Sequence, residues 1–413
     1  MIDRRTVLRR ILTFLCAASA LRPAPPPPDL EALWKANQWF ELRDAVQTGK
    51  PAEFYKGAVA AAFGPEADAM RWLKLASQSD PAATHRALAE GYLAALCDRM
   101  GRYRDAFDWH RRMAEISPQA KIPMAQNQSQ DLLKAFSGLP DQLVTHRGYS
   151  RLECSKDRGV VAIPLEIDGQ AGCYSLDTSS AFSSMGEVEA KRVGLEMQGE
   201  GFDLGGIHVQ VGVAHELKTG KFRIRNVAFV VFPGDSAAFG AEPAILGVQV
   251  VVAFETVRWS ANGTVELGFP ADRSAAAPNM YFNWMLPVIG VDVVGRRVGL
   301  QLDTGSDHSF LWPEFARAFP TVTVLAGPLD QYRQVGLFGS TSVPFWPVPE
   351  LQFEVGGAPL TLRAVKLLAA DTQKNCMWCY GTLGVDLVGD AGAVTIDFRA
   401  MRVTLSGARP PGD

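Results

Sequence analysis

Hydrophobic and polar residues change their pattern about a third of the way along the chain. Residues 29–136 contain few runs of β-branched residues and much Ala, Leu, Arg and Glu, a composition that favours helices. From Arg147 onward, short runs rich in Val, Ile and Phe alternate with Gly and Asn turns, as in 160–167 and 222–232. The pattern predicts an all-α domain over 29–140 and a mainly-β region after it.

The helical region repeats itself. At a shift of 37 residues, four positions match: Gly57, Gly64, Ala69 and Pro81 correspond to Ala94, Gly101, Ala106 and Pro118. Small residues let two helices approach closely, Gly interrupts the chain between them, and Pro ends the pair. The repeat resembles the tetratricopeptide (TPR) repeat of about 34 residues. That resemblance implies a docking surface for a peptide or protein partner, and a helical spacer packed on the β region is the alternative.

The β region divides into two similar halves, which we expect over 147–270 and 279–406. In each half a hydrophobic strand ends in an Asp-Thr motif, and an apolar-apolar-Gly sequence follows about 70 or 80 residues later. The first half supplies Asp177-Thr178-Ser179-Ser180 and Gly247, and the second supplies Asp303-Thr304-Gly305-Ser306 and Gly384.

These motifs resemble those of aspartic peptidases, especially the retropepsin-like and pepsin-like families and bacterial proteins with two retropepsin-like halves in one chain. The likeness covers about 250 residues, 160–405. A lone Asp-Thr-Gly is common by chance, but two copies with matching Gly motifs are not. The resemblance implies a multidomain protein: a TPR-like helical domain, then a bilobal aspartic-protease fold of two retropepsin-like β-barrel halves. A monomer would hold a complete site.

The chemistry explains why the motif needs two carboxyl groups. Like charges a few ångströms apart do not both ionise easily, so one carboxyl stays protonated. The charged group takes a proton from water, and the protonated group donates to the peptide carbonyl. The resemblance implies that Asp177 and Asp303 form this pair in an endopeptidase, with a peptide or protein substrate and no metal or cofactor.

The resemblance also implies roles for the neighbouring residues. Thr178 and Thr304 would brace the two loops against each other by hydroxyl-to-backbone hydrogen bonds. Ser180 and Ser306 would donate to the outer oxygens of the carboxylates.

The glycines have a steric role in the family, and one position departs from the pattern. Gly305 would leave its amide close to its Asp, and Gly247 and Gly384 would let a strand pass tightly behind each loop. Ser179 stands where the family usually has Gly, and a Cβ there would narrow the site or change the backbone angles. Two functions stay open: an active endopeptidase with an adapted loop, or a catalytically silent peptide-binding module on a TPR-like docking scaffold.

Aspartic peptidases close a β-hairpin flap over the substrate. The candidates are residues 205–217, which begin with Gly205 and Gly206, and residues 334–343, which contain Gly336 and Gly339. Plain surface hairpins are the alternative.

Residues 1–24 have the pattern of an export signal. Four arginines precede an apolar stretch over 11–21, which is too short to span a bilayer. The run Asp3–Arg9 resembles a twin-arginine signal, and an ordinary secretory signal is the alternative. A Pro-rich spacer over 25–28 follows. We expect a periplasmic or secreted protein that meets the membrane only through its uncleaved signal.

An exported chain meets an oxidising compartment, where disulfides persist. Cys376 and Cys379 have redox-motif spacing, but no thioredoxin-like pattern surrounds them, so a local disulfide is expected. Cys154 with Cys173 is a candidate second bridge. Cys97 lies in a helical pattern and is expected to be a small buried hydrophobe.

Composition and charge exclude some classes of protein. Hydrophobic residues make up 47% and charged residues 21%, which excludes a wholly disordered chain. With 41 Lys and Arg against 44 Asp and Glu, the net charge is −3, which excludes a large uniform basic surface for nucleic acid.

Overall fold

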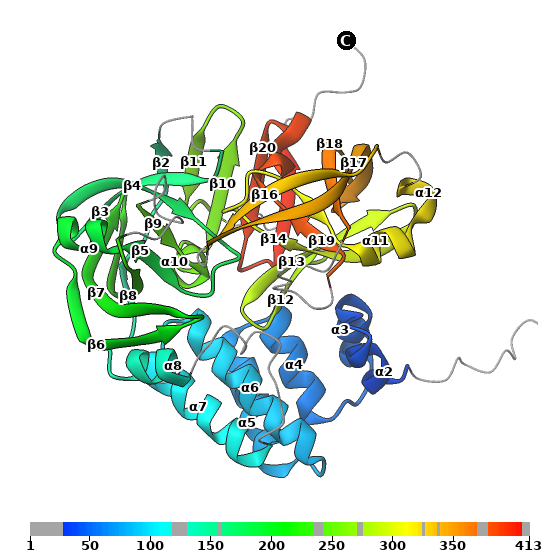
Figure 1. The fold of residues 1–413 in the computed structure, drawn as a ribbon. Helices are drawn as coiled ribbons and strands as arrows, with labels where there is room; N and C mark the ends of the chain where they lie inside the picture. Colours follow the sequence, from blue (N-terminus) through cyan, green and yellow to red (C-terminus); the bar gives the residue numbers. More distant parts are fainter. Residues whose placement is uncertain are drawn as a thin grey trace, which may run out of the picture. The chain divides into compact units, whose positions relative to one another are not determined.

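The computed structural model describes residues 28–117, 130–154, 159–234, 243–270, 276–323, 327–336, 339–369 and 379–406 (Figure 1). These residues form two compact units, one ending at Pro51 and the other beginning at Ala52. The first unit holds α2 (Leu30–Lys35) and α3 (Trp39–Thr48). Asp29 starts α2, because its carboxylate accepts the backbone N–H groups of Glu31 and Ala32.

The second unit begins with four helices in which neighbours along the chain pack together: α4 (Glu53–Phe63), α5 (Glu66–Ser79), α6 (Ala83–Arg99) and α7 (Tyr103–Ile116). A shorter helix, α8 (Gln130–Ser137), packs on α7. Gly57 permits the close contact of α4 and α5, because a Cβ there would lie 2.7 Å from Leu73. Gly101 separates α6 from α7 with a φ of +65°.

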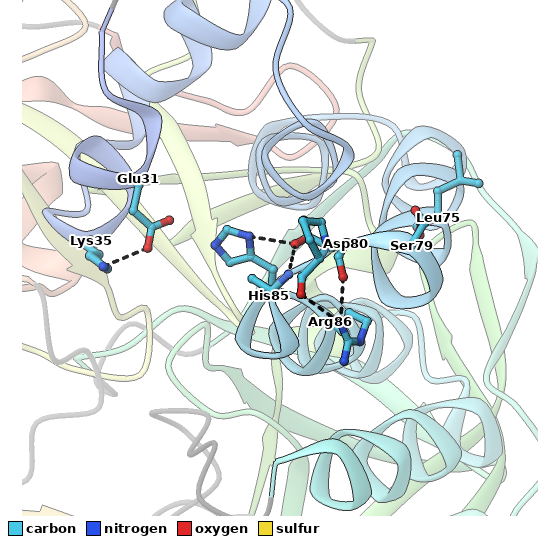
Figure 2. A network of polar contacts seen from close by, with 9 residues as sticks. Glu31, Lys35, Leu75, Ser79, Asp80, His85 and Arg86 are labelled. Atoms are coloured by element: carbon cyan, nitrogen blue, oxygen red, sulfur yellow. Dashed lines mark hydrogen bonds and ion pairs between the residues drawn. The ribbon is translucent and has the colours of Figure 1, made fainter.

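The turn from α5 into α6 is held by a polar network around Asp80, shown in Figure 2. The Asp80 carboxylate accepts the Ala82 N–H at 2.9 Å and lies 3.3 Å from His85 Nδ1. Arg86 donates to the Asp80 carbonyl at 2.8 Å. His85 also stacks on Phe54 of α4. These contacts fix the α5–α6 turn, which connects the α4–α5 pair of helices to the α6–α7 pair.

Three sheets follow. The first contains β1 (Leu143–His146), β3 (Ala162–Ile167), β4 (Gln170–Leu176), β5 (Ser183–Gly186), β6 (Glu196–Leu204), β7 (Ile207–Thr219), β8 (Phe222–Phe232) and β9 (Ala244–Leu246). The second contains β12 (Met280–Asn283), β13 (Leu286–Val293), β14 (Arg296–Leu302), β15 (Phe310–Leu311), β16 (Asp330–Gly336), β17 (Gly339–Val355), β18 (Ala358–Leu368) and β19 (Gly381–Leu383).

Short helices interrupt these sheets: α9 (Glu187–Val193), α10 (Val248–Ala253), α11 (Pro313–Ala318), α12 (Pro320–Thr323) and the 3-10 helix η3 (Val385–Ala391). The third sheet contains β2 (Ser150–Glu153), β10 (Thr256–Ser260), β11 (Thr264–Leu267), β20 (Ala393–Asp397) and β21 (Arg402–Ser406). It joins strands from both halves of the β region, because β10 pairs with β20.

The two eight-stranded sheets share one strand order. Seven strands of the first run β3-β4-β9-β5-β8-β7-β6, and seven of the second run β13-β14-β19-β15-β18-β17-β16. In the first, β3 also pairs with β7, and in the second, β13 pairs with β17. Each sheet therefore curls back on itself through equivalent strands. We call these two regions the first and second lobes.

The helices contact the second lobe through the β12–β13 turn. Tyr92 of α6 stacks on Trp284 at 4.1 Å between ring centroids. The buried Arg99 guanidinium donates to the carbonyls of Trp284 and Ala61, at 2.6 and 2.8 Å, and lies 4.1 Å from the Phe282 ring. Burial lowers the pKa of Arg99 to about 10. A side chain on α6 thus fixes a turn in the second lobe.

The helices contact the first lobe through a buried apolar cluster. Tyr103 of α7 packs edge-on against Phe136 of α8, and Phe136 against Phe182, which lies just beyond the first Asp loop. Leu204 and Val209 of the β6–β7 hairpin belong to the same cluster. The core is therefore continuous from the helices to the hairpin predicted as the first flap. No helix of the described residues is long and apolar enough to cross a membrane.

Candidate active site

Each Asp-Thr motif directly follows a buried strand that pairs in parallel with a short partner. Asp177 follows β4, which pairs with β9, and Asp303 follows β14, which pairs with β19. The backbone N–H groups of both Asp residues donate to the last residues of those partners, Leu246 and Leu383, each at 2.9 Å. The two loops therefore begin with the same local geometry.

The two threonines tie the loops together. The buried Thr178 hydroxyl donates to the Leu302 carbonyl at 2.7 Å, and the Thr304 hydroxyl donates to the Leu176 carbonyl at 2.6 Å. In addition, the backbone N–H of each threonine donates to the hydroxyl of the other, at 3.1 and 3.2 Å. These reciprocal bonds hold the starts of both Asp loops in one rigid centre.

Gly247 and Gly384 lie where a chain passes close behind each loop. A Cβ on Gly247 would lie 2.5 Å from the Phe182 carbonyl carbon, and one on Gly384 would lie 2.7 Å from that of His308. Backbone atoms cannot move aside cheaply, so neither position has room for a Cβ.

Two serines that sequence reasoning missed orient these glycines. The Ser183 hydroxyl accepts the Gly247 N–H at 3.0 Å, and the Ser309 hydroxyl accepts the Gly384 N–H at 3.1 Å. Each serine lies six residues after its Asp, in Asp177…Ser183 and Asp303…Ser309. That repeated spacing was a usable signal. Ser309 also donates to Asp386, at 2.6 Å.

The two carboxyl groups meet. A side-chain hydrogen bond joins Asp177 and Asp303, and both residues keep partial access to solvent. Burial of the carboxyl raises the pKa of Asp177, and hydrogen bonds from Ser179 and Ser180 oppose that rise. Burial, and next the charge of Asp177, raise the pKa of Asp303 well above its usual range. The pair therefore favours a state with one proton.

Ser179 points into this pair. Its backbone N–H and its hydroxyl both donate to Asp177 Oδ1, at 2.7 and 2.8 Å, and the hydroxyl also contacts the Asp303 carboxyl. The φ of Ser179 is not positive, so the side chain forces no left-handed backbone. The Cβ is therefore accommodated without a positive φ at Ser179.

The hydroxyls of Ser180 and Ser306 differ from their predicted role. Each donates to a carbonyl two residues ahead, that of Phe182 or His308, at 2.8 Å in both cases. A hydroxyl has one hydrogen to donate, and in both loops it goes to a backbone carbonyl of the turn, so it does not reach the carboxylate. Ser180 still contacts Asp177 through its backbone N–H, at 3.1 Å.

The two flap candidates are both hairpins, in different surroundings. The first turns at Gly205 and Gly206, whose φ values are +59° and +84°, and its strands belong to the buried cluster described above. In the second, Gly336 pairs with Gly339, and the first residues of β17 are exposed. Residues 337–338 of its turn lie outside the described part of the chain.

Cys154 forms a disulfide with Cys173. Cys379 is also disulfide-bonded, whereas Cys376 lies outside the described residues. Cys97 is a free buried thiol, and burial raises its pKa to about 12. Within the described residues, no group of three or more His, Cys, Asp and Glu side chains is placed to hold a metal ion.

Comparison with known proteins gives little beyond this geometry. No protein-family model matches the chain, and no curated protein matches it. Among solved structures it is similar to a retropepsin-like aspartic protease from Rickettsia conorii, with 16% sequence identity and a TM-score of 0.23. That likeness covers 31% of this chain and 92% of the other. The chemistry of the site has to be inferred from its own residues.

Proposed function

We propose that the protein is an aspartic endopeptidase in which Asp177 and Asp303 activate water for attack on a peptide bond. One observation carries the proposal: two carboxyls from equivalent loops share a hydrogen bond where Thr178 and Thr304 lock those loops together. A purely structural pair of buried acids would be costly, because each raises the energy of ionising the other.

The mechanism uses the single proton of the pair. The charged carboxylate takes a proton from a water molecule, and the protonated carboxyl donates to the oxygen of the scissile carbonyl. Attack gives a neutral tetrahedral diol. The carboxyl that received the water proton then protonates the leaving nitrogen. As the C–N bond breaks, the other carboxylate takes a proton back from a diol hydroxyl, so the carbonyl re-forms and the pair again holds one proton. No covalent intermediate forms on the enzyme.

We further propose that the lobes are two retropepsin-like halves and that α4–α7 form a TPR-like pair of repeats. The shared strand order of the lobes and the sequential packing of the helices support these assignments. Since both acids come from one chain, a monomer would be complete. The helices would dock a protein partner or the substrate, and the hairpins would cover the bound peptide.

Export is part of the proposal. The N-terminal pattern of arginines followed by an apolar stretch supports a periplasmic or secreted location. The Cys154–Cys173 disulfide is consistent with an oxidising compartment.

The test is cleavage of a peptide library by the full-length protein between pH 3 and 8, read by mass spectrometry. We expect cleavage by the wild type and none by Asp303→Asn or Asp177→Asn. Asp307→Asn, which changes an exposed acid near the second loop, is the matched control and should cleave normally. Undiminished cleavage by Asp303→Asn would reject the assignment.

One observation favours a second function, a catalytically silent peptide-binding module. The Ser179 hydroxyl contacts both carboxyls, where an attacking water would also bind. Measurable peptide binding with no turnover by the wild type at any pH would favour that function. Turnover that depends on both acids would exclude it.

A further inference from the structure

The two Asp loops differ in how many hydrogen bonds reach each carboxylate. Asp177 Oδ1 accepts three: from the Ser179 N–H at 2.7 Å, the Ser179 hydroxyl at 2.8 Å and the Ser180 N–H at 3.1 Å. Asp303 Oδ1 accepts the Gly305 N–H at 3.0 Å. The N–H equivalent to that of Ser180, on Ser306, instead donates to the Asp303 backbone carbonyl at 3.3 Å.

This difference decides which acid is charged. Donors aimed at one oxygen stabilise its ionised form, and backbone N–H groups cannot turn away. Asp177 therefore holds the negative charge more easily, and that charge keeps the proton on Asp303. We propose that Ser179 is a positioning residue that fixes the ionisation of the pair, with Asp177 as the carboxylate and Asp303 as the protonated acid. Their assignment as general base and general acid rests on the proposed function.

The asymmetry has a steric basis as well. A Cβ on Gly305, the position equivalent to Ser179, would lie 2.6 Å from Asp177 Cγ and 2.8 Å from its Oδ2. The second loop therefore has no room for the side chain that the first loop carries. Only the first loop can supply a hydroxyl at this position. That hydroxyl donates to Asp177 Oδ1 and also contacts the Asp303 carboxyl, so the two backbone N–H groups of Ser179 and Ser180 carry the part of the asymmetry that acts on Asp177 alone.

The other acidic groups near the two Asp loops interact with residues outside the Asp177–Asp303 pair. The charge of Asp177 acts on Asp303, whereas Asp303 acts on Asp177 as a hydrogen-bond partner. Asp307, on the second loop, is exposed and interacts with Tyr332 of β16 and Lys366 of β18. Asp386 of η3 accepts from the N–H and hydroxyl of Ser309. The hydroxyl of Ser179 is thus the side-chain difference between the two loops that bears directly on the pair.

The test titrates the carboxyls directly. Full-length protein labelled with ¹³C at the Asp carboxyl carbons is followed by NMR against pH, and the two signals are assigned by their loss in Asp177→Asn and Asp303→Asn. We expect Asp177 to titrate first in the wild type. Removing a hydrogen bond to a carboxylate disfavours the charged form, so Ser179→Ala should raise the midpoint of Asp177 by about one pH unit.

Two further variants complete the test. Ser179→Gly should shift the midpoint in the same direction, and it shows whether the effect comes from the lost hydroxyl and not from the Cβ that alanine retains. In Ser180→Ala the lost hydroxyl donates to the Phe182 carbonyl and not to a carboxylate, so the Asp177 midpoint should stay within about 0.3 unit. If the enzyme is active, the acidic limb of kcat/KM should move up in pH with Ser179→Ala.

Two results would overturn the inference: an unmoved Asp177 midpoint in both Ser179 variants, or an Asp303 signal that titrates first in the wild type. Because the titration needs no turnover, its failure is separable from that of the proposed function. A wild type that never cleaves peptide but titrates as expected refutes only the peptidase.

Discussion

The two lobes share a strand order but differ in what surrounds their hairpins. The β6–β7 hairpin of the first lobe places Leu204 and Val209 in a buried cluster with Phe136 of α8. The β16–β17 hairpin of the second lobe begins β17 with exposed residues. The Asp loops diverge in the same way, with Ser179 opposite Gly305. The shared topology places Asp177 and Asp303 at equivalent points of the two lobes. The lobes differ in the packing of their hairpins and in the residue that follows the Asp-Thr pair.

The first prediction breaks the packing that distinguishes the hairpins. Phe136→Ala removes a ring that joins α8 to Phe182 and should lower the free energy of unfolding by about 3–5 kcal/mol. Amide exchange should then become faster in β6–β7 and change little in β16–β17. Denaturant unfolding and hydrogen–deuterium exchange check both effects, and equal acceleration in the two hairpins would contradict the comparison.

The second prediction compares substitutions at the equivalent positions of the two loops, Gly305 and Ser179. Gly305→Ala forces a methyl group against the Asp177 carboxyl and should lower kcat/KM at least about 100-fold. Ser179→Gly, which removes a side chain from the other loop, should keep the enzyme active. Steady-state kinetics on one library-derived peptide compare the two variants. Similar losses in both would show that the loops are equivalent after all.

The third prediction tests the symmetric part of the site. Thr178→Val and Thr304→Val each remove a buried hydroxyl that makes reciprocal bonds, and each should lower the free energy of unfolding by about 1–3 kcal/mol. Because the bonds match in length, the two losses should agree within about 1 kcal/mol. A large effect from one threonine alone would show that the brace is one-sided.

The fourth and smallest effect is on pH-dependent stability. A carboxyl whose pKa is raised by folding is protonated in the folded state and ionised in the unfolded state, so its contribution to stability falls as pH rises above about 4. Asp303→Asn removes this penalty and should be more stable than the wild type at pH 7 by on the order of 1 kcal/mol, because partial solvent access weakens the effect.

That gain should vanish near pH 3, where Asp303 is protonated in both states. Asp177→Asn should gain less, because hydrogen bonds oppose the rise in the pKa of Asp177. Thermal unfolding at both pH values measures these differences, and a larger gain from Asp177→Asn would reverse the inferred order of the two acids.

The centre of the site could be predicted because its motif occurs twice in the sequence. The two Asp-Thr motifs and the paired Gly247 and Gly384 place backbone atoms, and backbone geometry follows from strand, turn and glycine. The Ser180 hydroxyl was not predictable in the same way. Its rotamer depends on which acceptor the turn brings within reach, and here that acceptor is the Phe182 carbonyl.

The docking of the helices lay beyond sequence reasoning altogether. Arg99 and Trp284 are 185 positions apart, and neither lies in a motif that points to the other. Helical and strand patterns give each element its buried face, but they do not say which apolar face meets which. The buried contact of Arg99 with the β12–β13 turn therefore emerges only in three dimensions.

The most direct measurement is a structure of the protein with a statine-type peptide, which mimics the tetrahedral diol. We predict that its hydroxyl binds between the carboxyls of Asp177 and Asp303, within about 3 Å of an oxygen from each. A mimic that binds elsewhere, or that contacts only one of the two acids, would contradict the shared dyad on which the proposed peptidase depends.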